Sequence, residues 1–178
     1  MRKLKVTELK RIDVRQFKAS DKTPLTVVLD DVRSMYNVGS VFRTADSFRL
    51  EKIMLCGITA CPPHPEIHKT ALGAELSMEW KKCENTIEAV NKLHEEGYEV
   101  YALEQVEHSV PLQNFKVKQG KKYALILGNE VKGVSQEAVN ICDGAIEIPQ
   151  FGTKHSMNVS VSGGIAIWQI ASQLLKLQ

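Results

Sequence analysis

Short apolar runs alternate with helical patterns along most of this 178-residue chain. Five runs clearly predict strands, at 25–30, 52–56, 98–103, 123–127 and 145–148, and a weaker run lies near 76–81. Apolar residues spaced three or four apart predict helices at about 38–48, 85–96, 135–141 and 158–176. Near-continuous apolar strands separated by helices indicate an α/β fold, with a mostly parallel sheet and helices on both faces.

The N-terminal segment differs in charge from the rest of the chain. Residues 1–22 carry eight Lys or Arg and three Asp or Glu, a formal charge of +5, whereas the whole chain carries +2. One interpretation is a basic arm that binds a polyanion such as RNA. The other is a solvated helix with Leu9, Ile12 and Phe17 packed underneath. Both stay open, and we divide the chain into this arm and one domain over 23–178.

Composition argues against metal sites and membranes. The four cysteines have no regular spacing, and the chain has no apolar stretch of membrane-spanning length and no signal segment at Met1. Cys56, Cys61, His64 and His68 lie close together, but the two pairs lack the long intervening segment of zinc fingers. We therefore expect reduced thiols, a cytoplasmic location, no membrane partner and no metal.

Three loops at the carboxyl ends of predicted strands carry glycines and polar residues. They are DDVRSMYNVGSVFR at 30–43, LGNEVKGVS at 127–135 and IPQFGTKHSMNVSVSGG at 148–164. In a parallel α/β sheet, ligands gather at this edge, where glycines allow close backbone approach and helix N-termini offer unpaired N–H groups. One such loop alone is a weak signal because turns favour the same residues, but three in order are specific.

Taken together, the three loops resemble the motifs of the SPOUT superfamily of knotted methyltransferases, specifically the SpoU/TrmH-like tRNA and rRNA ribose 2′-O-methyltransferases. The motif residues are Asn37, Gly39 and Arg43 in NVGSVFRTAD, Gly128, Glu130 and Gly133 in LGNEVKGVS, and Ile148, Pro149, Ser156 and Asn158 in IEIPQFGTKHSMNVSVSGGIAI. The resemblance covers about residues 24–175. Met157 stands where leucine is commoner, a substitution that conserves volume.

The resemblance implies a C-terminal trefoil knot, which general rules of chain topology would not predict. It also implies a homodimer that binds S-adenosylmethionine in a bent conformation within the knot. By the same likeness, cofactor contacts come mainly from the backbone at Leu103 or Glu104, Gly128, Ile148 and Met157. Main-chain groups then read the adenine, and side chains only shape the pocket.

The implied activity is methyl transfer to a ribose 2′-hydroxyl of tRNA or, as second choice, of rRNA. Arg43 resembles the catalytic arginine of the family, and Asn37, Glu130, Ser156 and Asn158 resemble the shell that fixes it and the ribose. A guanidinium with a pKa above about 12 is a poor base and a good bidentate phosphate clamp. We therefore expect Arg43 to hold the 2′-alkoxide and a phosphate together.

Three alternatives remain open. Arg43 as an ordinary surface residue would pair with Asp46 or Asp30. Another branch of the superfamily methylates a guanine nitrogen, although the Asn-Gly-Arg pattern of the first motif argues against it. A non-catalytic RNA-binding homologue is the third, disfavoured because Glu130 and Ser156 are present with Arg43. The sequence names no particular RNA or nucleotide, because phosphate contacts carry no sequence information.

Overall fold

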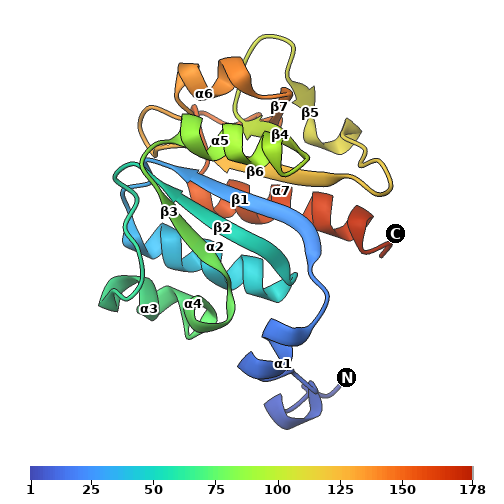
Figure 1. Ribbon diagram of the computed structural model, residues 1–178. Coiled ribbons are helices and arrows are strands. Elements are labelled where there is room, and N and C mark those ends of the chain that lie inside the picture. The colour runs from blue at the N-terminus through green and yellow to red at the C-terminus, as the bar shows by residue number, and fades with distance from the viewer. Residues whose placement is uncertain (178) are drawn as a thin grey trace.

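The computed structural model describes residues 1–177, the side chain of Val6 apart, and contains a seven-stranded sheet (Figure 1). Its strands lie in the order β3-β2-β1-β6-β4-β7-β5, and every neighbouring pair is parallel. They are β1 Thr23–Asp30, β2 Leu50–Cys56, β3 Trp80–Cys83, β4 Tyr98–Leu103, β5 Val110–Pro111, β6 Lys122–Leu127 and β7 Gly144–Glu147. The predicted parallel sheet is confirmed.

Helices cover both faces of the sheet, as predicted. They are α1 Val14–Ala19, α2 Met35–Ser47, α3 Pro65–Ala71, α4 Ala74–Ser77, α5 Thr86–Glu95, α6 Gln136–Ile141 and α7 Val159–Leu174, with 3-10 turns η1 Val6–Glu8 and η2 Leu112–Asn114. Helices α2 and α7 cover one face, and α5 and α6 cover the other (Figure 1). Successive side chains of a strand point to opposite faces. Val27 and Leu29 of β1 therefore join the apolar cluster under α2 and α7, whereas Val28 joins the cluster under α5 and α6.

The helices of the first and third loops begin at polar caps. Asn158 opens α7 as predicted, because its side-chain oxygen accepts from the Ser160 amide at 2.9 Å. Helix α2 begins at Met35, three residues before its predicted start, since Ser34 is the cap and accepts from the Asn37 amide at 3.3 Å. Asn37 consequently lies buried in the first turn of α2.

The segment between β2 and α5 differs from the prediction. The weaker strand expected near 76–81 begins only at Trp80, and residues Ala74–Ser77 form α4. Helix α3 is not predicted, because the prolines before it disfavour a helix. Pro65 nevertheless fits, since it occupies a first-turn position where no intrahelical bond needs its missing N–H. These helices are too short for their apolar spacing to stand out, and β5 has only two residues.

The N-terminal arm packs through one side chain. Helix α1 lies at one end of the molecule, away from the sheet and against α4 (Figure 1). Phe17 is 4% exposed and belongs to the core cluster, as the packed-helix interpretation expects. That interpretation is wrong for Leu9 and Ile12, which are exposed. The role of the arm in RNA binding stays a prediction.

Candidate cofactor and catalytic site

A cavity of about 470 Å³ lies at the carboxyl ends of β4, β6 and β7. Its size is typical of sites that enclose a small molecule. The predicted site residues in its walls are Leu103, Glu104, Gly128, Glu130, Ile148, Ser156, Met157 and Asn158. All five predicted cofactor contacts therefore line one cavity, together with three of the five predicted catalytic residues.

The loop after β6 is closed so tightly that Gly128 has no room for a side chain. A Cβ atom there would lie 2.2 Å from both the Gly133 carbonyl carbon and the Val134 amide nitrogen. The loop folds back on itself through two bonds between Asn129 and Gly133, at 3.0 and 2.9 Å. Gly133 has a φ of 69°, a conformation that favours glycine. The absence of a side chain lets backbone form this wall of the cavity.

Glu104, which directly follows β4, holds this loop in place. Its carboxylate accepts from the Val134 amide at 3.0 Å and from the Gln105 amide at 2.9 Å. Its own amide donates to the Ile146 carbonyl of β7 at 3.0 Å, so this N–H is not available to a ligand. Sequence reasoning misses Gln105, whose side chain donates to the His155 carbonyl at 3.1 Å and joins two walls of the cavity. Its position directly after a buried strand is the signal that points to it.

Glu130, Asn37 and Asn158 form one hydrogen-bonded network beside the cavity. The Glu130 carboxylate accepts from the amides of Arg33 and Ser34 at 3.0 and 2.9 Å, and from the Asn37 side chain at 2.9 Å. The Asn158 side chain donates in turn to Asn37 at 3.1 Å. Residues from all three predicted motifs thus meet, although they are up to 121 positions apart in the sequence.

The network keeps Glu130 ionised. Desolvation alone would raise its pKa, but the hydrogen bonds from Arg33, Ser34 and Asn37 outweigh it and lower the pKa below its usual value. A carboxylate held in this way has no proton to donate at neutral pH. Glu130 therefore acts as a fixed acceptor that ties the second loop to the first.

Asp30, at the end of β1, is a buried anchor that sequence reasoning assigned differently. It is 5% exposed, and its carboxylate accepts from the Thr86 hydroxyl at 2.5 Å and from the Ser135 amide and hydroxyl at 2.8 and 2.9 Å. Buried carboxylates require such partners. Asp30 thus holds the starts of α5 and α6 and is not a partner of Arg43.

Arg43 opens onto a different hollow, of about 420 Å³, on the outer side of α2 and α3. Within residues 1–177, no carboxylate lies within 4.0 Å of its guanidinium. Asp46, the other partner considered, accepts instead from the Ser77 hydroxyl at 2.5 Å. The structure therefore gathers Asn37, Glu130 and Asn158 but leaves Arg43 apart from them within one chain.

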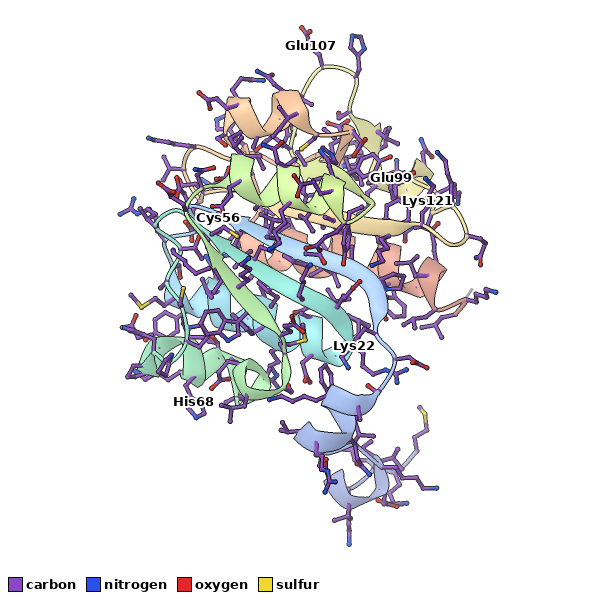
Figure 2. All side chains as sticks on the ribbon, in the orientation of Figure 1. Lys22, Cys56, His68, Glu99, Glu107 and Lys121 are labelled. Carbon is purple, nitrogen blue, oxygen red and sulfur yellow. The ribbon has the colours of Figure 1, made fainter. Side chains whose placement is uncertain are left out.

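The four residues considered as zinc ligands have separate structural tasks. Cys56 is buried, which raises the pKa of its thiol, and the Cys61 thiol donates to the Thr59 carbonyl at 3.9 Å. His64 caps α3 by accepting from the Glu66 amide, and His68 pairs with Glu75. Figure 2 shows Cys56 at the end of β2 and His68 on α3, well apart. Among the described residues, no group of three or more His, Cys, Asp or Glu side chains is arranged to hold a metal.

No helix in the described part of the chain has the length and apolar character needed to cross a membrane. The longest apolar helix, α7, instead contributes Ala166, Ile167 and Ile170 to the core cluster. Its packing against the sheet accounts for its high apolar content.

The fold and the cavity together define a parallel α/β protein whose small-molecule site lies at the carboxyl edge of its sheet. The family model of the SpoU rRNA Methylase family matches residues 24–168, and the chain belongs to that family. The trefoil knot remains a prediction from this membership.

Two curated relatives are similar over nearly the whole chain. A tRNA (guanosine(18)-2′-O)-methyltransferase of Thermus thermophilus is 29% identical over 96% of this chain and 86% of its own length. A 23S rRNA (guanosine-2′-O-)-methyltransferase of Vibrio parahaemolyticus is 28% identical over 94% of this chain and 67% of its own length.

Solved structures agree with the fold. An AdoMet-bound rRNA methyltransferase of Sinorhizobium meliloti has a TM-score of 0.79 and 27% identity, over 89% of this chain and 60% of that one. The A. aeolicus TrmH/SpoU tRNA modifying enzyme also has a TM-score of 0.79, with 24% identity over 92% of this chain and 83% of that one. The second likeness, at this identity, supports the fold alone.

Proposed function

We propose that this protein transfers a methyl group from S-adenosylmethionine to a ribose 2′-hydroxyl of RNA, with tRNA as the first candidate and rRNA as the second. The observation that carries the proposal is the cavity lined by the second and third family motifs, with Asn37 of the first motif hydrogen-bonded to Glu130 and Asn158 beside it. The relatives named for guanosine 2′-O-methylation of tRNA and 23S rRNA support it. An RNA-modifying role also supports the proposed cytoplasmic location.

The cavity fits this cofactor in size and character. Leu103, Ile148 and Met157 give it apolar surface, and the Gly128 backbone forms a wall without a side chain. We assign the main-chain groups at these four positions and the Glu104 carbonyl to cofactor binding. S-adenosylmethionine, when bound, supplies an activated methyl group and leaves as a neutral thioether. The protein's own task is therefore to position the ribose and stabilise charge on its oxygen.

The polar residues around the cavity divide this task. Asn37 and Asn158 are held by the Glu130 network, so the starts of α2 and α7 have fixed positions beside the cavity. Ser156 is exposed at the mouth of the cavity, where its hydroxyl is available to the substrate. We assign Ser156 to holding the ribose and the other three to supporting that geometry.

Arg43 completes the site only if the arginine comes from a second copy of the chain. In this proposal Arg43 holds the 2′-alkoxide and a substrate phosphate, yet within one chain it lines a hollow that shares no residue with the cavity. Helix α7 starts at the cavity and presents an exposed apolar stripe of Val161, Ile165 and Trp168 beside α2. Such a stripe marks a protein interface. A second copy on this α2–α7 face forms the homodimer and brings its own Arg43 to the cavity.

Alkaline cleavage of RNA tests the reaction. The 2′-oxygen must attack its own phosphate, so a methyl on that oxygen blocks scission at one bond. Incubation with S-adenosylmethionine and tRNA, or rRNA as second substrate, is expected to create one gap in the ladder. Methyl incorporation with an unbroken ladder would favour the guanine-nitrogen alternative. Absence of incorporation into either RNA would favour a non-catalytic RNA-binding protein.

A further inference from the structure

The hollow beside Arg43 contains a second cation, Lys69 of α3. Its walls are Ser40, Arg43, Thr44, Ser47, Lys69 and Thr70. Within residues 1–177, no carboxylate lies within 4.0 Å of the Lys69 ammonium or the Arg43 guanidinium. Two like charges without a counter-ion repel each other, and an anion placed between them removes that repulsion.

The two cations stand on rigid elements at a fixed spacing. A Cβ atom on Gly39 would lie 2.2 Å from the Thr70 hydroxyl and 2.3 Å from the Ile67 carbonyl, so α3 contacts the backbone of α2 at this glycine. The Thr70 hydroxyl donates across the junction to the Tyr36 carbonyl at 2.9 Å. The Lys69 ammonium lies 6.0 Å from the centre of the Tyr36 ring. Gly39 therefore sets the distance between the helices that carry Arg43 and Lys69.

The hydroxyl groups of the hollow identify the kind of anion. Ser40, Thr44 and Ser47 donate to carbonyls of their own helix at 2.8, 3.0 and 2.9 Å, and Thr70 donates to Tyr36. With these hydrogens donated within the protein, the hydroxyl oxygens still have lone pairs that can accept from a ligand. They suit a ligand that donates, and the cations suit a phosphate. A ribose-phosphate backbone has both groups next to each other, because the RNA 2′-hydroxyl is a donor as well as an acceptor.

We infer that this hollow binds a phosphodiester and an adjoining ribose hydroxyl of the RNA substrate, with Lys69 as a positioning residue beside Arg43. The inference rests on the proposed function, since it assigns the RNA backbone contact of the same reaction. A phosphate contact fixes the register of the RNA without reading its sequence. Lys69 thus contributes equally to the binding of any RNA.

Binding of RNA to Lys69→Ala, at several salt concentrations, tests the inference. Lys118→Ala is the matched control, because Lys118 is also an exposed lysine and lies in the distant segment before β6. We expect Lys69→Ala to weaken RNA binding about tenfold at low salt and to reduce the slope of log affinity against log salt by about one. S-adenosylmethionine affinity should not change, and Lys69→Arg should keep most of the RNA affinity.

Two outcomes would overturn the inference. If Lys69→Ala behaves like Lys118→Ala while the wild-type protein methylates RNA, the hollow is not the phosphate site and the proposed function stands. If DNA of the same sequence competes as well as RNA, the ribose hydroxyl is not read there. A third result would separate the two proposals. If no RNA is methylated but Lys69→Ala still binds RNA more weakly and with a smaller salt slope, the proposed function is wrong and the hollow remains the phosphate site.

Discussion

The cavity and the Arg43 hollow are built in opposite ways, although α2 lies beside the cavity through Asn37 and lines the hollow through Arg43. The cavity is walled by loops, a side-chain-free glycine and a carboxylate whose hydrogen bonds are all internal. The hollow is walled by side chains of two helices, and its cations have no carboxylate partner within residues 1–177. Shape and backbone suit a small ligand, whereas unpaired charge suits a polyanion.

This contrast makes the two ligands separable by mutation. A change in the cavity should alter cofactor affinity and leave RNA binding intact. A change in the hollow should do the reverse. Variants at Arg43 and Gly128 test the two sides of that division, and a variant that disturbs both ligands equally would break it.

The largest effect is expected for Arg43→Ala. We expect the rate of methyl transfer to fall about 100-fold or more, because the alkoxide and the phosphate lose their shared cation. Calorimetry should give an unchanged S-adenosylmethionine affinity. Arg43→Lys keeps the charge but loses the bidentate geometry of a guanidinium. Its rate of methyl transfer should therefore lie between those of the wild type and Arg43→Ala. Turnover above about a tenth of the wild-type rate in Arg43→Ala would contradict this role.

The next effect is expected for Gly128→Ala. The added methyl group would lie 2.2 Å from the backbone of Gly133 and Val134, so the loop must move. We expect S-adenosylmethionine affinity to fall at least about tenfold, with RNA affinity retained. Gly152→Ala is the control, because a Cβ atom there meets nothing within 4 Å. Equal cofactor affinity in the two variants would remove Gly128 from the wall of the site.

A smaller effect is expected for Glu130→Gln, and it should depend on pH. The folded-state pKa of Glu130 lies below its ordinary 4.5, so its ionised form stabilises the fold fully above that pH. This contribution is lost as the pH falls through the folded-state pKa. Urea unfolding should show a difference from wild type of about 1 kcal/mol at neutral pH, shrinking below about pH 4. A difference that stays constant into acid would mean that the charge of Glu130 does not hold the loop.

The smallest effect is expected for the basic arm. Deleting residues 1–22 removes a formal charge of +5, so RNA affinity should fall severalfold and its salt slope should flatten. Because Phe17 is buried, a second variant with Lys3, Lys5 and Lys10 changed to alanine keeps the packing and removes only charge. Filter binding at several salt concentrations measures both. Unchanged slopes in both variants would leave the arm a purely structural element.

Local pattern predicted most of the fold, whereas the residues that line the cavity were predicted from the family resemblance. Buried strands appear in the sequence as apolar runs, and Asn158 is a typical helix cap, so the sequence predicts both. The contacts between loops are not visible, because nothing near Asp30 indicates that Thr86 and Ser135 are its partners. The separation of Arg43 from Asn37 has another cause: six residues turn an α-helix by about 240° and place the two side chains on different faces, but the predicted helix began only after Asn37.

Mixed dimers test most directly the claim that the cavity and the Arg43 hollow complete each other across two chains. Arg43→Ala has an intact cavity and Gly128→Ala an intact arginine, and at an S-adenosylmethionine concentration too low for Gly128→Ala to bind it, each should be nearly inactive alone. If the second copy supplies Arg43, co-expression should restore RNA methylation to about a quarter of wild type, since half of the randomly formed dimers carry one complete site of two. Mixed dimers that form and remain inactive would show that Arg43 acts within its own chain and would contradict the account.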